Sequence, residues 1–413
     1  MPHYDVTVDK ILLLVRRLSS TTPPVLAIGW FDQVQAAVAK CATQRDFGPA
    51  SKENFSPSVH VYVATPTDTV EVSKVLGRLR AVSLAALTSC VFVAPSAFAQ
   101  SSHASLVVPA WAFPTSPAPN PAPKPDSVVM HRVPNSAREY TMRQVANAFD
   151  IPDWFPQSHT AMPASVQYGS RPNARACGYC HLPDGQGRPE NSTLAGLPVD
   201  YIVKQVRAFR DSTRLAANPA SKTNSMHLIA TSTSDTDVAI AAKYFSELKL
   251  TRRNIVREVA QLPKTRIEVM LYAYDGAGTE PIDDRLIEVP ETFARHELRD
   301  PTVVYTTYVP VGSIARGRRV AANGPNGVAT ACVTCHGPRL LGKDAVPPIA
   351  GRSPSNILRQ LMNFRTGARH DSLSIAMAPI VEKLSVRDMV SLAAYVGSRP
   401  PSAPAAVKRR QTP

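Results

Sequence analysis

The chain contains two closely related stretches, CGYCHLPDGQGRPENSTLAGLPVDYIVKQVRAF at residues 177–209 and CVTCHGPRLLGKDAVPPIAGRSPSNILRQLMNF at residues 332–364. A displacement of 155 residues superimposes them without a gap, so that Gln205 falls on Gln360. After a loop that is four residues longer in the first stretch, a displacement of 151 residues continues the match. One domain has therefore been duplicated.

Each stretch begins with C-x-x-C-H, the attachment pattern of a c-type haem. Two cysteines three positions apart on a helical turn present both sulfurs to one edge of a porphyrin. The adjoining histidine then reaches the iron from the same side. The pattern predicts two covalently bound haem c groups, attached through Cys177, Cys180, Cys332 and Cys335 and ligated by His181 and His336.

The cysteine pattern has three alternative uses. A Cys₄ zinc site would join two distant pairs and leave both histidines without a role. A thioredoxin-like C-x-x-C requires a surrounding βαβ pattern, which the sequence does not display. A disulfide across two intervening residues closes a very small loop and stabilises a fold little in the chain-entropy model. Two complete motifs favour haem.

Within each copy the haem motif is followed by a glycine-rich loop, an amphipathic helix, a methionine-bearing loop and a final helix. In the second copy Ser385 and Asp388 resemble a capping box that opens the last helix. Met377 then lies just ahead of a helix, and the repeat aligns it with Met226. Both methionines are predicted iron ligands; His227 is an alternative to Met226, although its repeat partner is an alanine.

The two stretches, together with MAPIVEKLSVRDMVSLAAYV at residues 377–396, resemble class I c-type cytochromes, above all the dihaem cytochrome c4 and single-haem c553 groups. The resemblance covers about 155–250 and 312–398. It implies small helical domains with His181 and His336 as proximal ligands and Met226 and Met377 as distal ligands. It also implies that Tyr244 and Tyr395 face the haem crevice from the last helices.

The chain departs from the compact dihaem pattern between the copies. Segments 266–274, 285–289 and 302–309 are rich in β-branched and tyrosine residues and are separated by turn residues. We therefore predict a mainly α protein with two tandem class I cytochrome c domains and a small β-containing insertion between them. The insertion leaves open how near the two haem sites lie to each other.

Residues 74–99, KVLGRLRAVSLAALTSCVFVAPSAFA, have the basic start, the apolar run and the Ala97-Phe98-Ala99 site of a secretory signal. The run of 14 residues from Ala81 to Ala94 is too short to cross about 30 Å of hydrocarbon as a helix. We expect cleavage after Ala99 and export to the periplasm. Residues 1–73 are then a translation start placed too early or a leader extension. An internal anchor behind a cytoplasmic extension is the alternative.

The remaining segments follow from composition. Seven prolines between Pro109 and Pro125 indicate a semi-rigid spacer. Residues 134–163 carry apolar anchors such as Trp154 and are expected to pack on the first haem domain. The predicted domains are a Pro-rich linker at 100–133, the first cytochrome c domain with its N-terminal extension at 134–250, the insertion at 251–311, the second cytochrome c domain at 312–400 and a basic Pro/Ala tail at 401–413.

The chain carries 46 Lys and Arg against 32 Asp and Glu, and 37 against 25 remain after residue 99. Export and the lack of a nucleic-acid motif argue against nucleic acid as the partner. A positive surface instead favours encounter with an acidic redox protein. We predict a periplasmic dihaem cytochrome that transfers single electrons between redox proteins of a respiratory chain and is not an enzyme.

Three rivals remain. A cytochrome subunit of a dehydrogenase or oxidase complex would use the insertion for docking. A dihaem cytochrome c peroxidase has two similarly spaced motifs but requires one open distal face. A thiosulfate-dehydrogenase-like enzyme needs a cysteine as distal ligand, and no cysteine after residue 99 is spare.

Overall fold

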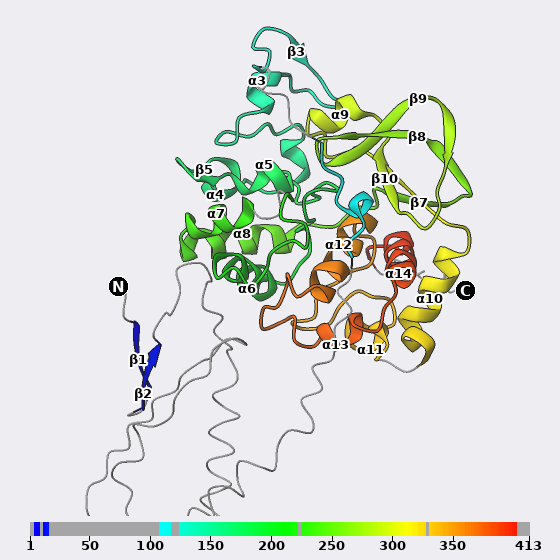
Figure 1. Ribbon diagram of the computed structural model, residues 1–413. Helices are drawn as coiled ribbons and strands as arrows, with labels where there is room; N and C mark the ends of the chain where they lie inside the picture. The colour runs from blue at the N-terminus through cyan, green and yellow to red at the C-terminus, as the bar shows by residue number, and fades with distance from the viewer. Residues whose placement is uncertain are drawn as a thin grey trace, which may run out of the picture. The chain divides into compact units, whose positions relative to one another are not determined.

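The computed structural model describes residues 4–8, 11–15, 107–116, 124–221, 225–327 and 330–402 (Figure 1). The chain divides into two units, Met1–Phe98 and Ala99–Pro413. Among the described residues of the first unit, β1 (Tyr4–Val8) and β2 (Ile11–Val15) form an antiparallel pair. The predicted signal at 74–99 and most of the predicted tail lie outside the described residues. None of the helices within the described ranges is long and apolar enough to cross a membrane.

The helices of the second unit repeat in the predicted order. The first copy contains α5 (Cys177–His181), α6 (Val199–Arg210), α7 (Ser225–Thr231) and α8 (Asp235–Glu247). The second copy contains α10 (Ser313–Asn323), the short 3₁₀ turn η4 (Pro325–Gly327), α11 (Cys332–His336), α12 (Pro354–Arg365), α13 (Ala378–Val381) and α14 (Val386–Ser398). The predicted capping box is confirmed, since Ser385 accepts from the Asp388 amide and the Asp388 carboxylate accepts in return.

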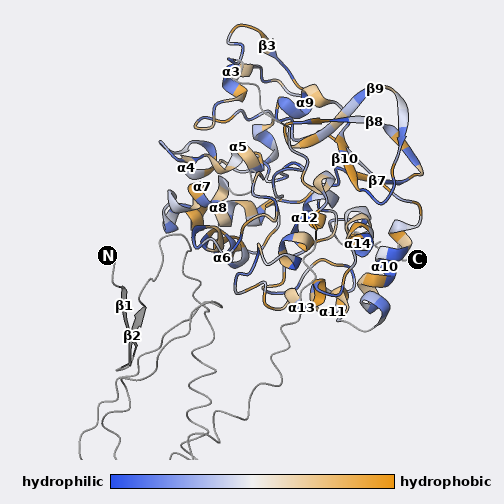
Figure 2. Cartoon of the chain, viewed as in Figure 1, coloured by the Kyte–Doolittle hydropathy of each residue, from blue (hydrophilic) through white to orange (hydrophobic). Residues whose placement is uncertain are grey.

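Helices α10 and α14 pack closely in the second copy. Gly317 on α10 lies against α14, and a Cβ at that position would clash with the carbonyl of Ser391. The face of α10 that contains Gly317 and Val320 is buried, whereas Arg318 and Arg319 are exposed. Figure 2 shows the corresponding hydrophilic and hydrophobic bands along this helix. The glycine thus permits a crossing that a larger side chain would prevent.

The insertion is a β structure, as predicted, but it has more strands than the sequence indicated. It contains β7 (Asn254–Glu258), β8 (Gln261–Glu268), β9 (Leu271–Pro281), β10 (Ile287–Pro290), α9 (Phe293–Glu297) and β11 (Tyr305–Val309). Strands β8 and β9 form a hairpin. The other three form a sheet of order β10-β11-β7, with β11 antiparallel to β10 and parallel to β7. The predicted fold class is confirmed.

The segment ahead of the first copy has short elements: η1 (Ala110–Ala112), β3 (Met130–His131), β4 (Tyr140–Thr141), α3 (Met142–Val145), η2 (Pro156–Ser158), α4 (Ala164–Gln167), β5 (Gly169–Ser170) and β6 (Ala174–Arg175). Trp154 is 2% exposed and donates its indole N–H to the Leu298 carbonyl at 2.8 Å. The extension is therefore attached to the insertion as well as to the first copy.

Part of the proline-rich stretch is also packed. The guanidinium of Arg359 on α12 donates to the Ala112 carbonyl at 2.7 Å and lies over the Phe113 ring. The Ser116 amide donates to the Val269 carbonyl at 3.0 Å, at the tip of the β8–β9 hairpin. Residues 107–116, which composition assigns to a spacer, thus pack against the second copy and the insertion, because Trp111 and Phe113 supply apolar anchors among the prolines.

Candidate haem-binding cavity

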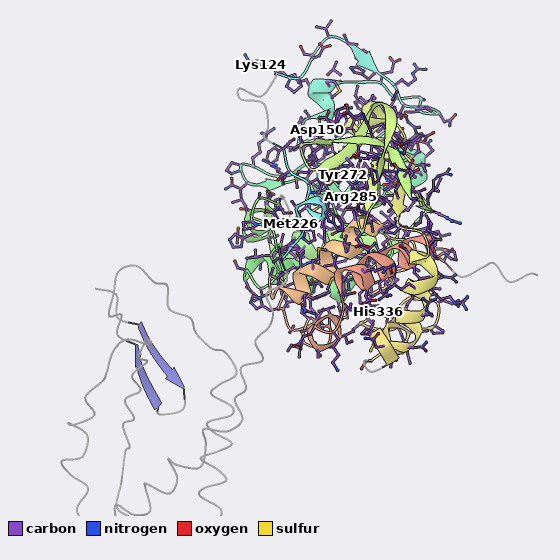
Figure 3. The ribbon with its side chains drawn as sticks, turned by 45° about the vertical axis from the view of Figure 1, so that its right-hand side comes forward. Lys124, Asp150, Met226, Tyr272, Arg285 and His336 are labelled. Atoms are coloured by element: carbon purple, nitrogen blue, oxygen red, sulfur yellow. The ribbon has the colours of Figure 1, made fainter. Side chains whose placement is uncertain are left out.

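One continuous cavity of about 1030 Å³ opens between the two repeat copies. Met226 and His336, labelled in Figure 3, lie in different copies and both line it. Seven of the eight predicted site residues line this cavity: Cys180, His181, Met226, Cys332, Cys335, His336 and Met377. Cys177 instead packs beside the buried cluster around Phe245. The insertion therefore does not separate the two predicted sites.

The two histidines are held in the same way. His181 Nδ1 donates to the Ser192 carbonyl at 2.7 Å, and His336 Nδ1 donates to the Pro347 carbonyl at 3.0 Å. The two carbonyls occupy equivalent positions of the repeat. Burial lowers the pKa of both imidazoles, outweighing the carbonyl hydrogen bond that raises it. Each ring is thus kept neutral with Nδ1 protonated, which leaves Nε2 as a free lone pair for a metal.

The two methionines line the cavity from the helices that follow α6 and α12. Met226 is near the start of α7, and Met377 is the N-cap residue of α13. His227, the alternative to Met226, turns elsewhere: its Nδ1 donates to the Phe209 carbonyl at 2.9 Å. Its neighbours Met226 and Ile229 line the cavity instead.

The walls of the cavity are apolar in both copies. Five pairs of repeat-equivalent residues line it: Leu194 and Ile349, Ile202 and Ile357, Val206 and Leu361, Phe209 and Phe364, and Ile229 and Ile380. Helical spacing explains why these residues of α6 line the cavity together: Ile202, Val206 and Phe209 recur four and three residues apart and so lie on one face of the helix. Such walls suit the apolar macrocycle of a haem.

The four cysteines of the two motifs form no disulfide with one another. The disulfide alternative is therefore excluded, and all four sulfurs are available for thioether bonds to haem. Burial raises the pKa of Cys177 to about 12 and that of Cys332 to about 11.

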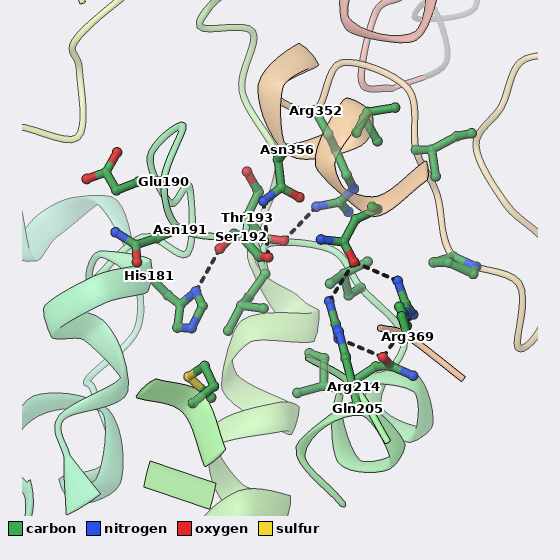
Figure 4. A pocket seen from close by; sticks show the side chains of 18 of the residues that line it. His181, Glu190, Asn191, Ser192, Thr193, Gln205, Arg214, Arg352, Asn356 and Arg369 are labelled. Carbon is green, nitrogen blue, oxygen red and sulfur yellow. Dashed lines mark hydrogen bonds between the residues drawn. The ribbon is translucent and has the colours of Figure 1, made fainter. Parts of the chain in front are cut away.

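The copies meet in a nearly symmetric cluster of glutamine and arginine (Figure 4). Arg214 donates to Gln205 Oε1 at 2.6 Å and to Gln360 Oε1 at 3.4 Å. Arg369 donates to Gln360 Oε1 and Gln205 Oε1, both at 2.9 Å. Because Gln205 and Arg214 are the repeat partners of Gln360 and Arg369, each arginine binds the glutamine of both copies. The displacement of 155 residues aligns Arg214 with Arg369 as it aligns the two glutamines, but sequence reasoning assigned none of the four a role.

Arg352 is a third buried cation on the cavity wall, and it donates to the carbonyls of Thr193 and Ala195. Burial lowers the pKa of Arg352 to about 10; burial, followed by the charge of Arg369, lowers that of Arg214 to about 9. One carboxylate, Asp371, pairs with Arg369 at 3.2 Å. Unbalanced cations in a low-dielectric site are costly. The two propionates of each haem would supply the missing negative charge, so the residues fit the predicted group.

The chain is similar in sequence to known electron-transfer proteins. Cytochrome c4 from Azotobacter vinelandii is 28% identical over 245 residues, which span 58% of this chain and 90% of that protein. A thiosulfate dehydrogenase electron acceptor from Stutzerimonas stutzeri is 35% identical over 100 residues, spanning 24% of this chain and 45% of that protein. The solved structure of reduced cytochrome c4 from Pseudomonas stutzeri is 22% identical, covers 54% of this chain and 93% of its own, and has a TM-score of 0.37. No family model matches the sequence.

The duplicated motif, the shared cavity and these relatives define the chain as a c-type cytochrome with two covalently bound haem c groups. It is a dihaem electron-transfer protein similar to cytochrome c4. When bound, the haem supplies an iron that alternates between the ferrous and ferric states and so carries one electron.

Proposed function

We propose that the chain is an exported carrier of single electrons between redox proteins of a respiratory chain, working in the periplasm. In this proposal Cys177, Cys180, Cys332 and Cys335 hold the haems, His181 and His336 are the proximal ligands, and Met226 and Met377 are the distal ligands. The observation that carries it is the presence of one histidine and one methionine from each copy on the wall of the same cavity.

His/Met ligation favours the reduced state of a haem and raises its potential. It also fills both axial positions, so neither iron offers a coordination site to a substrate. The chain's own contribution is to orient each imidazole through a backbone carbonyl and to surround the sites with apolar side chains that restrict water. A carrier, rather than an enzyme, is the function that this arrangement supports best.

The ligand assignment is tested by proton NMR of the reduced holoprotein. A methionine bound to ferrous haem has its methyl resonance shifted far upfield by the ring current, so the wild type should show two such signals. Met226→Ala and Met377→Ala should each remove one signal. Met389→Leu is the matched control, because Met389 is fully buried in the second copy but packs in the core. Retention of both signals in either alanine variant, or an open high-spin haem in each oxidised domain, would contradict the proposal.

A second candidate is the cytochrome subunit or dedicated electron acceptor of a dehydrogenase or oxidase. The relative from Stutzerimonas stutzeri, whose name describes an electron acceptor of thiosulfate dehydrogenase, supports it over a quarter of the chain. Purification from the native envelope separates the two: stoichiometric recovery with an enzyme favours the subunit, and recovery alone favours the mobile carrier. Peroxide turnover by the purified protein would instead indicate the dihaem peroxidase.

A further inference from the structure

The two C-x-x-C-H turns are unequally covered, although the repeat makes them equivalent. Cys180 in the first copy is partly buried, whereas Cys335 in the second copy is exposed. The loops that follow the two turns differ in exposure in the same way. Most of residues 182–190, after the first turn, are buried, whereas the loop after the second turn exposes Arg339, Lys343 and Asp344.

The cover over the first turn comes from the insertion. The Arg299 guanidinium stacks over the Tyr179 ring at 3.7 Å and donates to the Tyr179 carbonyl. Arg188, three residues from the end of the loop, lies 3.3 Å from His296 on α9. Arg253 donates to the Gly187 carbonyl at 2.6 Å. Residues of the insertion therefore pack over the first C-x-x-C-H turn and the loop that follows it.

The second turn has no such cover among the described residues. The backbone hydrogen bonds of its loop are local, from the Gly342 amide to the His336 carbonyl and between Lys343 and Val346. Helix α10 packs against α11, which carries His336 (Figure 3). This end of the molecule therefore presents the edge of the second site to the outside.

Exposed basic residues lie on the loop after the second turn and on α10, which packs against α11. Between residues 312 and 398 the second copy has eleven Lys and Arg residues against four Asp and Glu residues. Four exposed basic residues lie on α10 or on the loop after α11; we call them the basic rim: Arg318, Arg319, Arg339 and Lys343. Between residues 155 and 250 of the first copy, ten basic residues are nearly balanced by seven acidic ones.

Resting on the proposed carrier function, we propose that electrons enter and leave through the second haem domain, at the face around Cys335, and that the partner there is an acidic redox protein. The basic rim steers this partner, and the first haem exchanges electrons with it by way of the second. The insertion thus determines which haem domain exchanges electrons with the partner, because it covers the first of the two equivalent C-x-x-C-H turns. Electrostatic attraction of this kind raises association rates by about 10-fold or more and weakens with salt.

The test measures reduction of the oxidised holoprotein by reduced flavodoxin, a small acidic flavoprotein, in stopped flow. The variant Arg339→Glu/Lys343→Glu should slow the bimolecular reaction about tenfold at low ionic strength, with little effect at high salt. The control Lys204→Glu/Lys243→Glu makes the same change of charge on exposed residues of the first copy and should slow it less than about twofold. Reduction by free reduced riboflavin should be unchanged in both variants.

A second readout does not depend on electron transfer. Lysine acetylation followed by mass spectrometry should show Lys343 protected when redox-inactive apoflavodoxin is present, with Lys204 and Lys243 unprotected. Equal slowing by both double variants, or protection of the first-copy lysines instead of Lys343, would overturn the proposal that electrons enter and leave through the second haem domain. Failure of the wild type to accept electrons from either reductant would contradict the carrier function, while the acetylation pattern would still test the surface.

Discussion

Replacement of Arg369 by methionine should uncouple the two haem domains. The side chain is 5% exposed and joins elements that are distant in the sequence. It donates to Gln360 and Gln205 at 2.9 Å, to the Tyr201 hydroxyl at 3.2 Å and to the Asp371 carboxylate at 3.2 Å. Methionine preserves much of the apolar stem but provides none of these donors.

The expected loss follows from these contacts. Removing one partner of a buried ion pair costs about 3–5 kcal/mol, because the other charge, here Asp371, remains buried. Relief of the repulsion on Arg214, whose pKa the Arg369 charge helps to lower, returns about 1 kcal/mol. We therefore expect a net loss of about 2–4 kcal/mol in the free energy of unfolding. Arg369→Lys should lie between the variant and the wild type, because it keeps the charge without the planar fork.

Differential scanning calorimetry of the holoprotein measures this effect. The wild type should unfold in one transition, and Arg369→Met should resolve two, since the domains lose the hydrogen bonds that Arg369 makes across their junction to Tyr201 and Gln205. Arg387→Met, at an exposed position of α14, should change stability by less than about 0.5 kcal/mol. A loss below about 1 kcal/mol for Arg369→Met, with a single transition retained, would refute the reasoning.

Three further perturbations follow from buried contacts. Burial raises the pKa of Glu190, but the charge of Arg188, 3.1 Å away, and the interactions with His296 together outweigh it and hold that pKa well below its usual range. The Arg188–Glu190 ion pair therefore stabilises the fold fully above about pH 4.5, and the contribution is lost on acidification. Glu190→Gln should lose about 3 kcal/mol in urea unfolding at pH 7 and progressively less as the pH falls below about 4.5, since the contribution disappears only when Glu190 is protonated in the folded protein as well; a pH-independent loss would contradict the ion pair. Gly317→Val should lose at least about 2 kcal/mol by overpacking, against under about 1 kcal/mol for Ala322→Val on the exposed face of the same helix; similar losses would exclude the close crossing. Trp154→Phe should lose about 1–3 kcal/mol by leaving the Leu298 carbonyl unpaired, as thermal unfolding would show; an unchanged melting temperature would count against this anchor.

The repeat carried most of what could be predicted. A motif of five residues whose chemistry requires a fixed spacing predicted a haem site in each copy, because helical geometry places residues three and four apart on one side. The aligned methionines and the capping box of α14 were likewise local or repeated features. Prediction of the β insertion rested on residue type, and it missed β7, whose sequence NIVRE alternates too briefly to stand out.

The sequence did not predict which residues far apart along the chain come into contact. Trp154 was expected to pack on the first haem domain, but its indole reaches Leu298, 144 residues away. Residues 107–116 read as a spacer because proline dominates them, yet their aromatic residues find apolar surface on the second copy. Neither partner could be identified from periodicity, since both are set by how separate elements come together.

By itself, the sequence determined that one domain is duplicated, that each copy carries a C-x-x-C-H motif predicted to bind haem, and that a β insertion lies between the copies. Covalent chemistry and helical spacing are local, so they can be read along the chain. Only the tertiary structure decided that seven of the eight predicted site residues line one cavity, that four repeated polar residues join the copies, and that the insertion packs over the first C-x-x-C-H turn while the second stays exposed. These features depend on contacts between residues far apart in sequence, and identical motifs acquire different surroundings when only one of them lies beneath the insertion.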